Sequence, residues 1–195
     1  YGGDAGGKLL ALPKGIVTFV GIIACIAFLV EGAIMDWGGV FLTTVRHFDM
    51  ALAGMGFTVF SAAMLTMRLL GDWTVQKLGQ ERVVIGGSLL AVAGFLLIIF
   101  APTVVLLYLG FFFIGVGCAN VVPVFFSLLG KQHVMPISLA VPAVSTLGYL
   151  GILMGPAAIG FIAHQTSLYA AFTLLAALVL LQAVIAAYVY HHIVE

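Results

Sequence analysis

Charged side chains are scarce in this sequence. Lys and Arg number seven, Asp and Glu number seven, and charged residues make up 7% of the chain. An ordinary soluble domain is about a quarter charged and about half apolar, whereas hydrophobic residues make up 64% here. The formal net charge is zero, so the charge balance does not indicate nucleic acid as a partner. This composition excludes an ordinary soluble domain and indicates an integral membrane protein.

Cysteine and metal-binding patterns are also sparse. The two cysteines, Cys25 and Cys118, lie deep within apolar segments, which excludes a disulfide framework of the secreted type. No apolar segment contains a metal-spaced histidine pair, and no nucleophile can be named with a base nearby. The five histidines fall in predicted loops or in the tail: His47, His133, His164, His191 and His192. We therefore predict no metal, no cofactor and no enzymatic activity.

Long apolar runs fill most of the chain. A helix needs roughly 20 apolar residues to cross about 30 Å of hydrocarbon, and the runs are continuous, unlike the alternating strands of a membrane barrel. The sequence predicts six transmembrane helices, at about residues 15–42, 51–70, 83–100, 104–129, 138–163 and 168–190.

The chain begins at Tyr1 with a Gly-rich polar stretch, which we interpret as part of a longer protein. We predict a cytoplasmic linker stub over residues 1–14, a six-helix transmembrane bundle over 15–190 and a cytoplasmic tail over 191–195.

Basic residues are distributed unevenly between the two ends of the predicted helices. Only Arg46 lies at one end, and six basic residues lie at the other: Lys8, Lys14, Arg68, Lys77, Arg82 and Lys131. Because cytoplasmic loops carry an excess of Lys and Arg, we expect both termini in the cytoplasm.

Two carboxylates interrupt the first apolar segment, in the stretch VEGAIMDWGGVF. Glu31 lies about 22 Å along the helix from Ile16, in its predicted outer half, at about 1.5 Å per residue. An ionised acid there costs a few kcal/mol, so it should face a partner or cavity or be protonated. We expect Glu31 to carry protons or contact substrate, with a structural anchor as the alternative. Asp36 is a weaker candidate, because Trp37 beside it is typical of the membrane interface.

Two more polar side chains lie within the fourth and fifth segments. Asn120 precedes Pro123 in the stretch CANVVP; it can hydrogen-bond across helices, and Pro123 frees a backbone carbonyl for a ligand or water. Tyr149 lies among small residues at four-residue spacing, which predict a packing face. We expect Asn120 and Tyr149 to line the pathway. The alternatives are interhelical hydrogen bonding for Asn120 and core packing for Tyr149.

The second loop, RLLGDWTVQKLGQER over residues 68–82, resembles the cytoplasmic signature loop of the major facilitator superfamily. Gln76, Gln80 and Glu81 depart from the family pattern, and Arg68 with Asp72 one turn later could supply the acid and its partner in a shifted arrangement. The resemblance implies an inner gate made of Arg68, Gly71, Asp72, Lys77, Gly79 and Arg82. A solvated turn that obeys the positive-inside rule is the alternative.

The resemblance extends from about residue 14 to residue 190 and is strongest to the C-terminal half of a bacterial branch related to the fucose permease. It implies half of a twelve-helix fold, built of two inverted three-helix repeats, with a central cavity and alternating access. The implied partners are the lipid bilayer of the bacterial inner membrane, the missing N-terminal half, a small solute and protons. We expect proton-coupled transport of a sugar or polar metabolite. A drug-like efflux antiporter half and a non-transporting scaffold or sensor remain as alternatives.

Overall fold

The computed structural model describes residues 12–193, and every regular element in that range is helical. Six helical stretches are long and apolar enough to cross a membrane, as predicted. The first and fourth of these spans are each built from two elements. In chain order the elements are α2 (Ile16–Val40), the π-helical turn η1 (Phe41–Val45), α3 (Met50–Leu69), α4 (Gly71–Leu78), α5 (Gln80–Phe100), α6 (Val104–Cys118), α7 (Val121–Leu129), α8 (Ile137–Gln165) and α9 (Leu168–His192).

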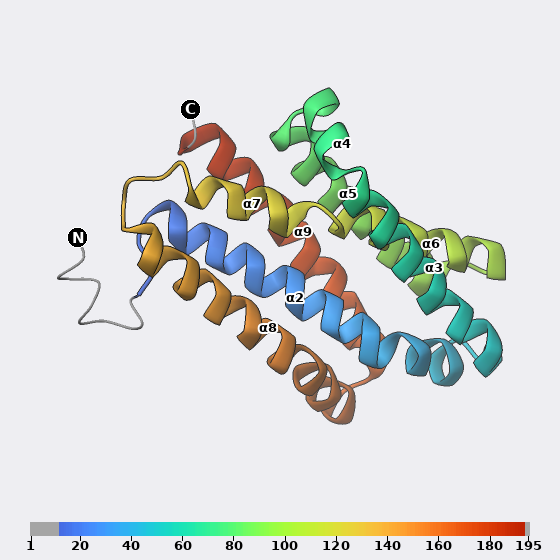
Figure 1. Ribbon diagram of the computed structural model, residues 1–195. Coiled ribbons are helices and arrows are strands. Elements are labelled where there is room, and N and C mark those ends of the chain that lie inside the picture. The colour runs from blue at the N-terminus through green and yellow to red at the C-terminus, as the bar shows by residue number, and fades with distance from the viewer. Residues whose placement is uncertain (1–11, 194–195) are drawn as a thin grey trace.

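The spans pack in a pattern that repeats between the two halves of the chain. The first helix of one half, α2, packs on α8 and α9, and the first helix of the other half, α6, packs on α3 and α5. The third helices, α5 and α9, pack on each other. Figure 1 shows α2, α3, α7 and α8 in front. This exchange agrees with the predicted pair of three-helix repeats.

Small residues bring α8 against α2, as the sequence predicted. A Cβ added to Gly155 would lie 2.5 Å from the backbone oxygen of Leu29, and one added to Gly151 would overlap the backbone oxygen of Cys25. Membrane helices associate through close packing and not through the hydrophobic effect. The glycines therefore hold these two helices together by letting their backbones approach.

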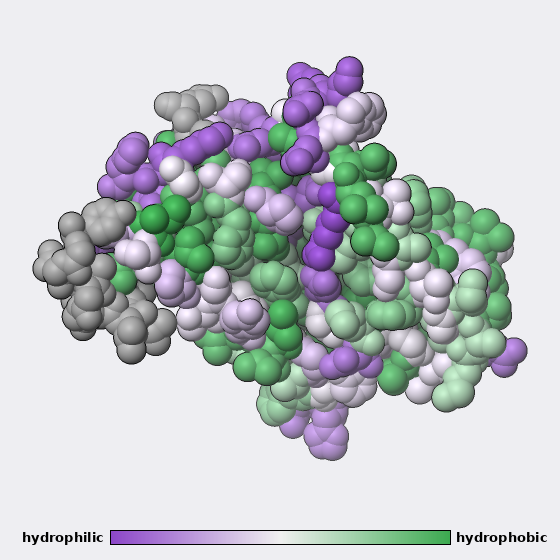
Figure 2. All heavy atoms as spheres, viewed as in Figure 1, coloured by the Kyte–Doolittle hydropathy of each residue, from purple (hydrophilic) through white to green (hydrophobic). Residues whose placement is uncertain are grey.

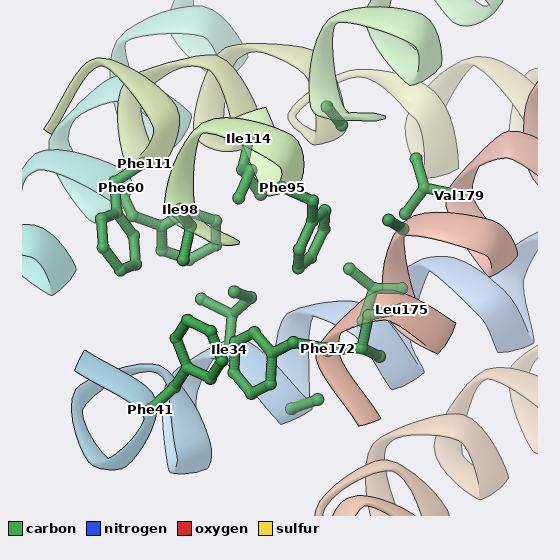
Figure 3. Close-up of a cluster of buried hydrophobic side chains, with 14 of the residues drawn as sticks. Ile34, Phe41, Phe60, Phe95, Ile98, Phe111, Ile114, Phe172, Leu175 and Val179 are labelled. Carbon is green, nitrogen blue, oxygen red and sulfur yellow. The ribbon is translucent and has the colours of Figure 1, made fainter. Parts of the chain in front are cut away.

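An aromatic core fills the bundle toward the η1 end. Phe41 of η1 stacks on Phe172 of α9 with ring centroids 4.3 Å apart, and Phe95 of α5 meets Phe172 edge-on at 6.5 Å. Figure 3 shows these rings converging with Phe111 and Phe60 from α6 and α3. Because η1 contributes to this core, the first span continues as a helix to Val45, beyond its predicted end at residue 42.

The longer first span changes the depth of Glu31. It is the sixteenth residue of the 30-residue stretch Ile16–Val45 and so lies near its middle, whereas we had predicted the outer half. A carboxylate at the middle of the bilayer is the most costly to leave unpaired.

The predicted second loop is largely helical, which corrects the sequence interpretation. Residues 71–78 form α4, joined to α3 through Leu70 and to α5 through Gly79. Gly79 has a φ of 87°, a conformation that suits glycine because it lacks a Cβ.

The boundaries at the two ends of the chain are only partly described. Most of the predicted stub, including Lys8, lies outside the described residues, and α2 begins at Ile16. Helix α9 continues to His192, two residues past the predicted end of the bundle.

Candidate functional site

Three neighbouring pockets form a row, which we call the seam: two lie between α2 and α3, and the third lies between the end of α3, α4 and α7. The pocket at the η1 end has a volume of about 290 Å³, the middle pocket about 230 Å³ and the pocket at the α4 end about 450 Å³. Met35 and Phe57 line both of the first two, and Arg68 lines both the middle pocket and the α4-end pocket. The three pockets therefore adjoin in this order, each separated from the next by side chains that line both.

Glu31 and Arg68 form an ion pair at the middle pocket. Arg68 Nη2 of α3 lies 3.9 Å from Glu31 Oε2 of α2, and the two side chains are 45% and 24% exposed. Figure 2 shows a hydrophilic strip that descends from the region of α4 into the middle of an otherwise apolar face. Opposite charges in a membrane protein typically pair in this way where they face a cavity. The pair lies at the pocket that has the smallest volume of the three.

The fourth span breaks between α6 and α7, at Ala119 and Asn120. Pro123 has no N–H to donate to the carbonyl four residues earlier, which is that of Ala119. Arg68 Nε donates a hydrogen bond of 3.4 Å to this Ala119 oxygen. The Ala119 carbonyl, which we expected to be free for a ligand or water, therefore accepts a hydrogen bond from a side chain of α3.

Asn120 makes the reverse connection, from the break to the end of α3. Its Nδ2 donates to the Met67 oxygen at 3.2 Å, one of the last four carbonyls of α3, which lack partners within the helix. Gly71 packs against the amide so closely that an added Cβ would lie 2.6 Å from Asn120 Oδ1. Arg68 and Asn120 thus cross-link α3 and the break in both directions.

The pair expected between Arg68 and Asp72 is wrong. Over residues 12–193, Arg68 pairs with Glu31, and the one other contact between a basic nitrogen and a carboxylate joins His191 and Glu81. The reason is the turn at Leu70, where α3 ends with ψ near 4°, so that residues 68 and 72 are not on one continuous helix. Asp72 instead lines the α4-end pocket.

The remaining gate residues lie around α4. Lys77 is in the last turn of α4, Gly79 separates α4 from α5, and Arg82 is in the first turn of α5. Both basic side chains are exposed. They lie at the same end as Gly71 and Asp72, but the structure pairs neither with a carboxylate among the described residues.

Asp36 and Tyr149 lie apart from the ion pair. Asp36 lines the η1-end pocket, so it faces the row of pockets at one end. Tyr149 of α8 is 68% exposed and lines none of the three pockets, so the structure does not bring it to the seam. The neighbouring Trp37 donates a hydrogen bond from Nε1 to the Pro156 oxygen of α8 at 2.9 Å, and its place at the membrane interface stays a prediction.

Several residues of the seam were missed by sequence reasoning. Ser61 and Met64 line the middle pocket. The sequence did contain a signal for the Arg68 contact: Pro123 has no N–H, so the carbonyl of Ala119 lacks its helical donor. The spacing of residues along the chain did not indicate which donor would reach it.

Comparison with known proteins places the chain in a family. Residues 17–193 match the Major Facilitator Superfamily. The chain belongs to this superfamily. It is 46% identical over 174 residues to an uncharacterized MFS-type transporter of Yersinia pestis, covering 89% of this chain and 45% of that protein. It is 35% identical to an uncharacterized transporter of Sinorhizobium fredii, covering 94% of this chain and 48% of that protein.

The membrane protein MosC of Rhizobium meliloti is 30% identical over 148 residues, which cover 76% of this chain and 36% of MosC. The chain therefore spans about half or less of the length of these relatives. The superfamily and the six membrane helices agree with the predicted half of a major facilitator fold, and the fucose permease branch stays a prediction.

Proposed function

We propose that this chain is half of a secondary transporter that moves a small polar solute across the bacterial inner membrane by alternating access. The observation that carries the proposal is the row of three pockets with the Glu31–Arg68 pair at its middle. A charged pair at the centre of a membrane span marks a solute or proton pathway in most membrane proteins. Asp36 at one end and Asn120 at the other line the same row.

The face that carries the row is the one to which a second six-helix half would bind. Helices α2, α3, α7 and α8 form this face in Figure 1. With the second half in place the row becomes an enclosed path. The α4 segment, with Gly71, Asp72, Lys77, Gly79 and Arg82, then forms a cytoplasmic gate that opens when the halves rock.

Glu31 is the proposed proton carrier. It lies at mid-span and its partner Arg68 stays charged at all accessible pH, so protonation of Glu31 alters the charge of the pair by one. Such a change biases the halves between two arrangements only if the two arrangements hold the pair differently. The two arrangements would hold the pair differently because the pockets around Glu31 and Arg68 close in one arrangement and open in the other.

The direct test is Glu31→Gln in the full-length protein, reconstituted into proteoliposomes loaded with a pH-sensitive dye. We expect wild type to admit protons together with one class of a panel of polar metabolites. Glu31→Gln should lose this proton movement and any stimulation of uptake by an imposed pH gradient, while exchange of solute without a gradient persists. Glu81→Gln is the matched control, since Glu81 is in an exposed pair with His191. Unchanged proton movement in Glu31→Gln would make the residue a structural anchor.

A further inference from the structure

Most N–H donors of the Arg68 guanidinium make no hydrogen bond to the described residues. Among residues 12–193, the one hydrogen bond that it donates is from Nε to the Ala119 oxygen, and the contact with Glu31 is a 3.9 Å ion pair. An arginine has five N–H donors in a planar fork that matches carboxylate and phosphate groups. Arg68 lines both the middle pocket and the α4-end pocket, and its Nη2 lies 3.9 Å from Glu31 Oε2.

From this geometry we propose that the transported solute is a small organic anion, whose carboxylate or phosphate group binds the terminal nitrogens of Arg68 in place of Glu31. This inference rests on the proposed function and narrows its solute class. The empty state holds Glu31 and Arg68 as a pair with zero net charge. The loaded state holds a protonated Glu31 and an anion on Arg68, again with zero net charge.

The chemistry of the two partners excludes the opposite arrangement. A solute cation on Glu31 would leave Arg68 unpaired at mid-span, and arginine cannot lose its proton to escape the cost. Glu31 can be neutralised by one proton, so only an anion leaves both members of the pair compensated. One proton bound per anion is therefore the expected stoichiometry for a monovalent solute. A neutral solute would leave the pair intact and would need no proton.

Other charged and titratable groups near the pair fit this assignment. Asp36 lines the η1-end pocket, which neither member of the pair lines, and Asp72 lines the α4-end pocket together with Arg68 without forming an ion pair with it. Within the described part of the chain, Arg68 is the cation that lines the middle pocket, so it is the group that an anion would meet there.

Pro123 is a positioning residue for this site. By freeing the Ala119 oxygen it supplies the acceptor that holds Nε of Arg68 and turns the fork toward the pockets. In Pro123→Ala a new N–H competes for that oxygen. The fork should then lose orientation while its charge remains.

The experiment compares charged and neutral probes of matched shape on the full-length protein. Glycerate is compared with glycerol and gluconate with glucose, and glycerol phosphate is the phosphate probe. Thermal stabilisation in detergent and uptake into proteoliposomes are measured for wild type, Arg68→Lys, Arg68→Gln, Pro123→Ala and Lys131→Gln. Lys131, exposed beyond α7, is the matched control.

We expect at least one anionic probe to stabilise wild type and to enter, with its neutral analogue inert. Losing a charged hydrogen-bonding group costs roughly 10- to 100-fold in affinity, so Arg68→Gln should lower uptake by that factor, with Arg68→Lys intermediate and Lys131→Gln unchanged. Pro123→Ala should raise the half-saturating concentration by roughly three- to tenfold with the maximal rate retained.

A double variant separates loss of anion binding from loss of stability. Arg68→Gln leaves Glu31 unpaired, so Glu31→Gln with Arg68→Gln removes both charges and should unfold at a higher temperature than Arg68→Gln alone, yet still bind no anion. Equal uptake of neutral probes by wild type and Arg68→Gln would overturn the anion assignment and leave the transport proposal standing. Equal stabilisation of wild type and Arg68→Gln by an anion would place that anion elsewhere. No flux and no stabilisation of wild type by any probe would overturn transport itself.

Discussion

Arg68 and Asn120 each donate to a backbone carbonyl that the other residue's helix leaves without a partner. The Ala119 oxygen lacks its donor because Pro123 follows four residues later, and the Met67 oxygen lacks one because α3 ends. A carbonyl left unpaired in a membrane span costs several kcal/mol. At the scale of residues, the break after α6 and the end of α3 therefore lie side by side, and each supplies the hydrogen-bond donor for the free carbonyl of the other.

Gly71 tests this arrangement. A Cβ at Gly71 would lie 2.6 Å from Asn120 Oδ1, so Gly71→Ala should push the amide away from the Met67 oxygen. Overpacking of this kind costs about 1–3 kcal/mol, and we expect a lower unfolding temperature in detergent. Gly86→Ala is the control, because a Cβ there meets nothing within 4 Å. An equal effect of both variants would mean that the Asn120 contact contributes nothing.

Elements are held together mainly by glycine faces. Helix α8 contains Pro142 and Pro156 and still packs along α2, because Gly148, Gly151 and Gly155 face it. The pair α5–α6 uses the same means, since a Cβ on Gly94 would lie 2.5 Å from the Gly110 oxygen. Small residues let helix backbones approach, which is the main source of packing energy between membrane helices.

The α2–α8 contact should be sensitive to a single methyl group. In Gly151→Ala the Cβ would overlap the Cys25 backbone oxygen, which cannot rotate away, so the helices must separate. We expect the unfolding free energy to fall by about 1–3 kcal/mol or more. Thermal denaturation measures this loss. Gly54→Ala on α3, where a Cβ meets open space, should change little. A stable Gly151→Ala protein would show that this interface tolerates separation.

At the scale of the whole molecule, six spans bring the start of α2, the end of α9 and α4 to one end of the bundle (Figure 1). Four of the basic residues that define the predicted cytoplasmic side, Lys14, Lys77, Arg82 and Lys131, lie at this end, and Arg68 in the last turn of α3 pairs with Glu31. Among Lys and Arg of the described residues, Arg46 is the one at the other end, where it donates to carbonyls that terminate α5. Its position thus has a local structural reason and does not weaken the charge asymmetry.

This topology predicts from which side of the membrane an introduced cysteine can be labelled. Lys77→Cys in α4 should react with a membrane-impermeant maleimide only from the cytoplasmic side, and Asp49→Cys before α3 only from the opposite side, in oriented vesicles. Both positions are exposed, and the native Cys25 and Cys118 are partly buried within spans. The parent protein without the added cysteines measures background. Reversed labelling of the two positions would invert the proposed orientation.

Part of this structure followed from the sequence because it depends on local composition. The six spans were predicted because each needs only its own run of apolar residues, and the α8 packing face because small residues recur along one helix. The Arg68–Asp72 pair was mispredicted because local spacing assumes a continuous helix, which Leu70 ends. Tyr149 was placed at the pathway although its direction depends on how α8 rotates against α2.

The sequence by itself determined that this is a membrane protein of six helices, that Glu31 must find compensation, and that Pro123 must leave a carbonyl free. Each of these follows from what hydrocarbon does to a single residue or segment. Only the tertiary structure decided which groups provide the compensation. Arg68 meets both Glu31 and the Ala119 oxygen because α2, α3 and the break between α6 and α7 come together in space, and no residue spacing within any one helix encodes that meeting.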